Sequence, residues 1–244
     1  MRITVIGAGP GGYEAAIMAA KLGAEVTCIE KDEVGGTCLN RGCIPTKAFL
    51  AASDVLETVE SAKDFGINID GTVSVDYKAV VDRKNKVKDG LIKGIHFLFE
   101  ENKVNLIKGT GKIVDKNTVE VTKEDGSTET VETDKIILAT GSVPVSPGMF
   151  KYDGKKVITS DEVLDLEKAP ESIIIVGGGV IGCEIGQFLS RMGTKVTIVE
   201  ALEQILPNED KDVSKQLLRQ FKKDKIKVHT GVGVAEVEVS DDGV

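Results

Sequence analysis

The sequence has no excess of basic charge and no long apolar run. Its 244 residues include 31 Lys and Arg against 39 Asp and Glu, which gives a formal net charge of −8. This balance argues against a general nucleic-acid or membrane-surface binder, since such proteins usually carry a basic patch. The longest apolar run, near Ile173–Ile181, contains three glycines and is too short to cross a bilayer. A first strand at Arg2 or Ile3 leaves no room for a cleavable targeting segment, so we expect a soluble cytoplasmic protein.

Cysteines are few, whereas glycines are abundant. The chain contains four cysteines and 27 glycines. In a reducing cytosol, a close cysteine pair is more often catalytic or metal-binding than a structural crosslink. Many glycines fall in ordered patterns, which indicates tight turns and close approach of the backbone to ligands. With 41% apolar residues, the chain can form a real core in one large domain or two small ones.

An internal repeat defines the expected architecture. The segments Ile3–Glu30 and Ile173–Glu200 match without a gap at a constant offset of 170 residues. Each predicts a strand, a glycine turn, a helix and a second strand. The strands are continuous aliphatic runs, typical of a parallel sheet that is covered on both faces. The sequence therefore predicts an α/β fold with two Rossmann-like dinucleotide-binding folds.

Each copy of the repeat contains the pattern G-x-G-x-x-G. Its first glycine permits a tight turn, its second lets a pyrophosphate approach the backbone, and its third lets the helix pack on the strand. The helix N-terminus offers N–H groups and a positive dipole end to the phosphates. Glycine turns without ligands are disfavoured, because both patterns lie between a predicted strand and a predicted helix. The glycines are Gly7, Gly9, Gly12, Gly177, Gly179 and Gly182.

An acidic residue ends the second strand of each copy. Glu30 and Glu200 both lie 18 residues after the third glycine of their pattern. A carboxylate at this point can bond a ribose diol and repel a 2′-phosphate. We therefore expect two dinucleotide sites, and Glu200 predicts NAD rather than NADP at the second.

The remaining segments fit around these two folds. Helices are predicted over 44–61 and 77–100, and short alternating strands over 104–131 with a turn at 124–126. These strands suggest a small antiparallel layer in the first fold. Residues 135–138 are predicted to form another buried strand.

A connecting segment is expected at residues 143–154, which hold two prolines and two glycines. We place the domain boundary near Met149. The prediction is an FAD-binding domain with a redox disulfide at 1–149 and an NAD-binding domain at 150–244.

Cys38 and Cys43 follow shortly after the first acidic residue, in the segment GGTCLNRGCIPTK. Five positions allow a disulfide within a bent loop or one distorted helical turn. Pro45 fits the first turn of a helix, so both thiols are expected near a helix N-terminus, which lowers a thiol pKa. A zinc half-site, an inert structural disulfide and two idle thiols are less favoured alternatives. Cys28 and Cys183 are expected to be apolar core residues.

These motifs, with the leading GAGPGG, the ATGS segment and the GGGVIGCE segment, resemble the pyridine nucleotide–disulfide oxidoreductase family over all 244 residues. The resemblance implies FAD in the first fold and NAD in the second. It also implies oxidation of a protein-bound dihydrolipoyl group, with electrons passing through Cys38–Cys43 and FAD to NAD. In such an enzyme Cys43 faces the flavin as a thiolate and Cys38 exchanges with the substrate dithiol. Lys47 is expected to pair with Glu184 near the flavin N5.

The residues implied to line the two cofactor sites follow from the matching motifs. For FAD they are Gly7, Gly9, Pro10, Gly11, Gly12, Glu30, Lys31, Gly36, Thr37, Cys38, Cys43, Lys47, Gly111, Ala139, Thr140, Gly141 and Ser142. For NAD they are Gly177, Gly178, Gly179, Val180, Ile181, Gly182, Glu184, Glu200 and Val232. No metal site is expected.

The resemblance also implies partners and missing parts. The partner would be a lipoyl-bearing protein of a 2-oxoacid dehydrogenase or glycine cleavage complex, and the full-length parent would be a homodimer.

Family members continue with the rest of the NAD domain and a dimerisation domain that supplies a His–Glu base. Neither His96, in a predicted helix, nor His229, at the end of a predicted strand, fits that base, and both are expected to be structural. We therefore expect a fragment that binds FAD weakly and turns over poorly or not at all.

Two other functions stay open, and a third is disfavoured. A related glutathione- or metal-type reductase would prefer NADPH over NADH. A redox-dead nucleotide-binding subunit would keep the fold without the chemistry. A single-cysteine flavin oxidase is disfavoured, because both Cys38 and Cys43 are present.

Overall fold

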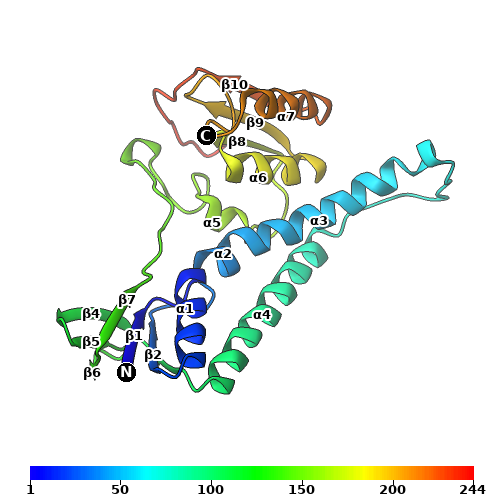
Figure 1. Ribbon diagram of the computed structural model, residues 1–244. Coiled ribbons are helices and arrows are strands. Elements are labelled where there is room, and N and C mark those ends of the chain that lie inside the picture. The colour runs from blue at the N-terminus through cyan, green and yellow to red at the C-terminus, as the bar shows by residue number, and fades with distance from the viewer. The chain divides into compact units, whose positions relative to one another are not determined.

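The computed structural model describes all residues from Met1 to Val244. They form two compact units, the first made of residues 1–45 and 85–143, and the second of residues 46–84 and 144–244 (Figure 1). Each unit contains one copy of the internal repeat and one parallel sheet. The long helices α3 (Cys43–Glu60) and α4 (Tyr77–Glu101) each contribute residues to both units.

The first unit is built on a four-stranded parallel sheet in the order β3-β2-β1-β7. Helix α1 (Pro10–Lys21) connects β1 to β2, and with the end of α4 it packs on one face, where Val5, Ala16 and Phe99 are buried. A three-stranded antiparallel sheet, β4-β5-β6, packs against the other face through β5. The strands are β1 (Arg2–Ile6), β2 (Glu25–Glu30), β3 (Asn105–Lys108), β4 (Thr110–Asp115), β5 (Thr118–Thr122), β6 (Thr128–Glu132) and β7 (Lys135–Leu138).

The second unit is built on a three-stranded parallel sheet in the order β10-β9-β8. Helix α6 connects β8 to β9, and Phe188 and Leu189 on this helix are buried in the core together with Ile198 of β9. The strands and helices of this unit are β8 (Ser172–Val176), β9 (Lys195–Glu200), β10 (Lys227–Thr230), α5 (Ser160–Val163), α6 (Val180–Arg191) and α7 (Lys211–Lys223). Shorter helices elsewhere in the chain are α2 (Gly36–Arg41), η1 (Ala62–Phe65) and η2 (Gly148–Phe150).

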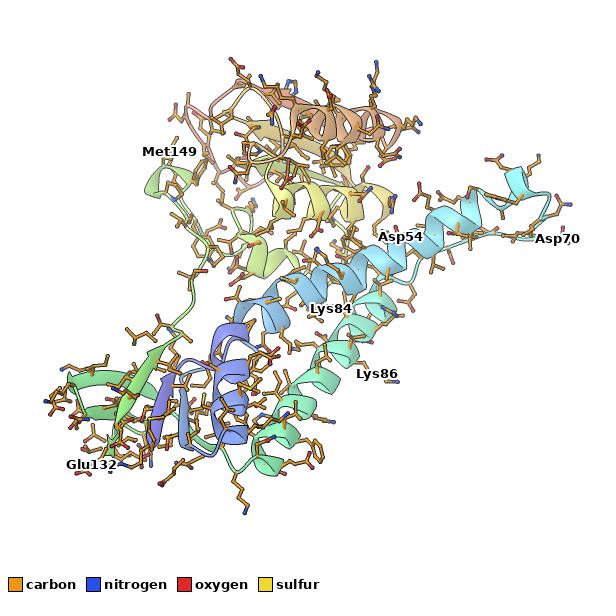
Figure 2. All side chains as sticks on the ribbon, in the orientation of Figure 1. Asp54, Asp70, Lys84, Lys86, Glu132 and Met149 are labelled. Atoms are coloured by element: carbon orange, nitrogen blue, oxygen red, sulfur yellow. The ribbon has the colours of Figure 1, made fainter.

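A buried lysine anchors the first turns of α4 in the second unit. The Lys84 side chain is only 2% exposed, and its Nζ donates to the Leu164 carbonyl at 2.9 Å and to Asp165 Oδ1 at 2.7 Å (Figure 2). The same ammonium lies 5.6 Å from the centre of the Phe49 ring. A buried cation is tolerated when such partners replace its water. None of the helices in the structure has the length and apolar character that a membrane span requires.

The predicted fold class is confirmed, and so are both long helices to within one residue at each end. Three details were wrong. Residues 105–108 join the parallel sheet instead of the antiparallel layer, because a helical crossover returns the chain parallel to the strand it left. The strand at 135–138 is not buried, since it is an edge strand and Leu138 is 64% exposed. Strand β8 is covered on one face only, because α6 packs on Ile173 and Ile175 while the alternate side chain of Ile174 is 60% exposed.

The division into cofactor-binding domains near Met149 stays a prediction. The compact units group residues by their contacts, whereas the predicted boundary concerns which cofactor each segment binds.

Candidate functional site

The first and third glycines of each pattern are required by the fold itself. Gly7 and Gly177 have φ angles of +101° and +108°, in the region that L side chains rarely adopt. A Cβ on Gly12 would lie 1.8 Å from the Gly7 carbonyl oxygen, and one on Gly182 would lie 2.2 Å from that of Gly177. The third glycine therefore lets the helix pack against the preceding turn, as the pattern predicts.

The second glycine of each pattern is not required by the protein. Gly9 and Gly179 have φ of −71° and −72° with extended ψ, a conformation open to any residue. A Cβ on Gly179 would meet no protein atom within 4 Å, and one on Gly9 would only reach ordinary contact with Gly36 Cα at 3.7 Å. The space in front of both backbones is open at a helix N-terminus, which fits a pyrophosphate.

The two acidic residues also brace the glycine turns. Glu30 Oε2 accepts the backbone N–H of Ala8 at 2.7 Å, and its Oε1 accepts that of Asp32 at 2.8 Å. Glu200 makes the corresponding two bonds in the second copy, also at 2.7 and 2.8 Å. Each carboxylate oxygen keeps a second lone pair that can accept a ribose hydroxyl. The sequence predicted the ribose role of the two acidic residues, but nothing in it indicated their hydrogen bonds to the backbone of the glycine turns.

A cavity of about 130 Å³ lies beside the first acidic residue. Glu30, Glu33, His96 and Lys108 are among its lining residues. His96 Nε2 lies 3.2 Å from Glu33 Oε1, and both side chains are about half-exposed. His96 therefore lies half-exposed on the first unit, and it lines a cavity that the sequence did not reveal.

The cysteine segment starts directly against the first glycine turn. A Cβ on Gly36, the first residue of α2, would lie 2.6 Å from Gly9 Cα. Cys38 is in the first turn of α2 and is half-buried, and Cys43 is the exposed first residue of α3. A Cβ on Gly42 would lie 3.2 Å from Cys38 Cα, so the chain folds back on Cys38 just before Cys43. The predicted lowering of the thiol pKa values stays a prediction.

Polar contacts hold this segment in place. Thr37 Oγ1 donates to the Ser142 carbonyl at 3.2 Å, which brings two of the predicted FAD-site segments together. Asn40 Nδ2 donates to the carbonyls of Val34 and Gly36, each at 3.0 Å. Asn40 is a supporting residue that sequence reasoning missed, and the only signal was its position between the two cysteines.

Two further predicted segments lie at the carboxyl ends of the parallel strands. A Cβ on Gly111 would lie 3.2 Å from Ile6 Cγ2 and 3.4 Å from Ile29 Cγ2, so β4 lies close over the ends of β1 and β2. The Ala139 N–H donates to the Ile6 carbonyl at 2.9 Å, and Gly141 has a φ of +72°. Ligands of open parallel sheets bind at this end of the strands.

In the second unit, Lys47 and Glu184 form an ion pair. Lys47 Nζ lies 2.5 and 2.6 Å from the two carboxylate oxygens of Glu184, with the carboxylate side chain mostly shielded from solvent. At the predicted nucleotide site, Val180 and Ile181 are exposed at the start of α6. The Val232 N–H donates to the Glu200 carbonyl at 3.1 Å, which places Val232 beside the second acidic residue.

The other two cysteines have buried thiols that are rarely ionised. Cys28 and Cys183 are both buried, and burial raises the pKa of each thiol to about 12. Their sulfurs face the backbone carbonyls of Gly7 and Gly178. The prediction that they are core residues is confirmed.

Residues 1–244 match the family described as pyridine nucleotide-disulphide oxidoreductase, and the chain belongs to that family. The predicted family and its class, an oxidoreductase acting with a pyridine nucleotide, are confirmed. Enzymes of this family that resemble the chain use FAD and NAD, which agrees with the two predicted cofactors.

Curated relatives narrow the assignment. The chain is 44% identical over 243 residues to a dihydrolipoyl dehydrogenase of Chlorobaculum parvum, covering 99% of this chain and 51% of that protein. It is 37% identical to one of Bacillus subtilis, covering 98% and 52%, and 42% identical to one of Acholeplasma laidlawii, covering 97% and 70%. The chain spans about half the length of most of these relatives.

Solved structures show the same fold. The crystal structure of LpdA from Mycobacterium tuberculosis matches with a TM-score of 0.91 at 27% identity, covering 100% of this chain and 56% of that one. The flavoprotein disulfide reductase RclA from Escherichia coli matches with a TM-score of 0.83 at 25% identity, covering 99% and 51%.

Proposed function

We propose that this chain carries the flavin, disulfide and nucleotide sites of a dihydrolipoyl dehydrogenase. One observation carries the proposal: α2 begins against the first glycine turn, with Gly36 packed on Gly9. The segment that holds both thiols thus starts at the proposed first dinucleotide site. The glycine turn, Glu30 and the adjoining cavity would hold FAD, and the turn before α6 with Glu200 would hold NAD.

Cys38 and Cys43 exchange electrons with the substrate as a disulfide. A thiolate of a protein-bound dihydrolipoyl group attacks the Cys38 sulfur, and the Cys38–Cys43 bond breaks with Cys43 leaving as a thiolate. The second substrate thiolate then displaces Cys38, which leaves a lipoyl disulfide and two reduced cysteines. FAD, when bound, supplies a two-electron carrier that returns the cysteines to the disulfide and passes the electrons to NAD.

Glu200 sets the nucleotide preference. Its carboxylate is braced by two backbone N–H groups, so it cannot swing away from the ribose position without losing both bonds. A fixed negative charge there repels a 2′-phosphate, which favours NAD over NADP. The Lys47–Glu184 ion pair would serve as a charge pair of the reaction, in the role that the family resemblance gives it.

The partner, the oligomeric state and the location of the full-length enzyme are part of the same proposal. The partner is a lipoyl-bearing protein of a 2-oxoacid dehydrogenase or glycine cleavage complex, the full-length enzyme is a homodimer, and the location is cytoplasmic.

The test uses the FAD-loaded chain without relying on turnover. After mild oxidation, dihydrolipoamide should convert the Cys38–Cys43 disulfide to two thiols, measured by alkylation and mass spectrometry of the peptide that holds both. Cys43→Ser is the control, because it cannot form the disulfide. NADH should bind more tightly than NADPH by about tenfold or more, and Glu200→Ala should reduce this preference. A chain that neither binds FAD nor forms the disulfide would contradict the proposal, and a preference for NADPH would favour a glutathione-type reductase.

A further inference from the structure

Helices α3 and α6 are joined by a second ionic contact besides Lys47–Glu184. Arg191 of α6 contacts two carboxylates of α3, with Nη1 lying 2.5 Å from Asp54 Oδ1 and Nη2 lying 2.5 Å from Glu57 Oε2 (Figure 2 labels Asp54). Asp54 follows Lys47 by seven residues, and Arg191 follows Glu184 by seven. Seven residues make about two helical turns, so the two contacts lie the same distance apart on both helices.

An aromatic contact lies along the same helix pair. The rings of Phe49 and Phe188 are stacked with their centres 4.4 Å apart and their planes within 3°, and both side chains are buried. Glu184, Phe188 and Arg191 follow the i, i+4, i+7 spacing of one helix face. The two helices therefore run in the same direction and meet at three points within the second unit.

The two ionic contacts place their positive charges on opposite helices, and this determines how α3 is aligned along α6. At the first contact the cation comes from α3, and at the second it comes from α6. If α3 slid by two turns in one direction, Lys47 would face Arg191. If it slid in the other direction, Asp54 would face Glu184. Either slip brings like charges together, so only the observed register satisfies both contacts.

Arg191 is suited to hold this register. Its side chain is only 14% exposed, and its planar guanidinium presents separate nitrogens to the two carboxylates. An unpartnered charge at such a shielded position is costly, so sliding of α3 is opposed at this end of the contact.

We propose that Arg191, with Asp54 and Glu57, is a positioning device that sets the register of α3 on α6 and thereby keeps Lys47 on Glu184. The importance of that ion pair rests on the proposed function. The positioning itself is independent of any cofactor, because every residue involved lies in the second unit and belongs to this chain.

The test measures how well Glu184 shields the Lys47 amine. In the whole chain without cofactors, limited acetylation by acetic anhydride is followed at each lysine by mass spectrometry. Arg191→Ala should raise the acetylation rate at Lys47 about fivefold, the factor that corresponds to about 1 kcal/mol of lost pairing. Exchanging the charges, with Arg191→Asp and Asp54→Arg together, should return the rate most of the way to wild type, which a loss of general stability would not allow.

Two further variants keep the result decisive. Asp54→Asn with Glu57→Gln removes both partner charges by changes at exposed side chains, and it should raise the Lys47 rate as Arg191→Ala does. Asp82→Asn is the matched control, because it removes the ion pair with Lys78 at 2.6 Å on α4 and should leave the Lys47 rate unchanged. Unchanged Lys47 acetylation in the Asn/Gln variant, or an equal rise in the Asp82 control, would overturn the proposal, whatever the FAD and disulfide tests show.

Discussion

Two adjacent glycines in α1 should respond to the same substitution with opposite signs. At Gly12, an added Cβ would lie 1.8 Å from the Gly7 carbonyl oxygen and 3.2 Å from the Ala139 Cβ. At Gly11, it would meet nothing within 4 Å. Both positions are in the first turn of α1 with helical backbone, so the substitutions differ mainly in the space that receives the methyl group.

The magnitudes follow from these distances. For Gly12→Ala, α1 must move away from the glycine turn by more than 1 Å to restore ordinary contact, and overpacking of this kind costs about 3 kcal/mol. For Gly11→Ala, the new residue lowers the entropy of the unfolded chain and stabilises the helix by about 0.5–1 kcal/mol. At roughly 2–4 °C per kcal/mol for a chain of this size, Gly12→Ala should lower the Tm by about 6–12 °C and Gly11→Ala should raise it slightly.

The assay is thermal and urea unfolding followed by circular dichroism, without added cofactor. Because no ligand is present, a loss of stability reports packing of the helix on its turn and not phosphate binding. Equal stability of the two variants would refute the reasoning, since it would mean that the turn and helix adjust freely to a side chain at Gly12.

Two predictions concern thiol reactivity and pH. Iodoacetamide at pH 8 should alkylate the exposed Cys43 and leave Cys28 intact in the native chain, because a pKa of about 12 leaves roughly 10⁻⁴ of that buried thiol ionised; rapid labelling of Cys28 would contradict its burial. Thr159→Ala removes the Thr159 hydroxyl, which in a capping box donates to Glu162 Oε2 at 2.7 Å and accepts the Asp161 N–H at 3.2 Å, and should cost about 1 kcal/mol at pH 7 in urea unfolding. Burial raises the pKa of Glu162, but hydrogen bonds from the Thr159 hydroxyl, the Thr159 backbone and the Tyr152 hydroxyl outweigh it, and the net pKa lies below its usual value of 4.5. The part of the stabilisation that comes from the hydroxyl bond to the Glu162 carboxylate is therefore present above about pH 4.5 and fades as the pH falls. The difference between wild type and variant should shrink in acid, and a constant difference would exclude this linkage.

The sequence alone determined the repeated elements and the class of site. Each strand–turn–helix–strand unit follows from short-range rules, namely the aliphatic runs, the positive φ that Gly7 and Gly177 require, and the acidic residues that end the second strands. The family followed from the same motifs, because the spacing of Cys38 and Cys43 after Glu30 is local information.

The sequence was less informative about which sheet a strand joins and which of its faces is covered. Residues 105–108 have a short apolar pattern that is compatible with either sheet. They join the parallel sheet because the crossover through α4 returns the chain beside β2 in the same direction. The exposed side chains of Ile174 and Leu138 are as aliphatic as those of the buried positions, so their composition does not report which face is covered.

Only the tertiary structure decided how distant segments meet. It packs Gly36 on Gly9 and brings Lys47 to Glu184, residues that are 137 positions apart. It also gives Arg191 two carboxylate partners on another helix, for which no local pattern exists. The physical reason is that such contacts depend on the register of one packed element against another, and this register is set by side chains from both elements together. The sequence lists those side chains, but their pairing is fixed only when the elements are packed.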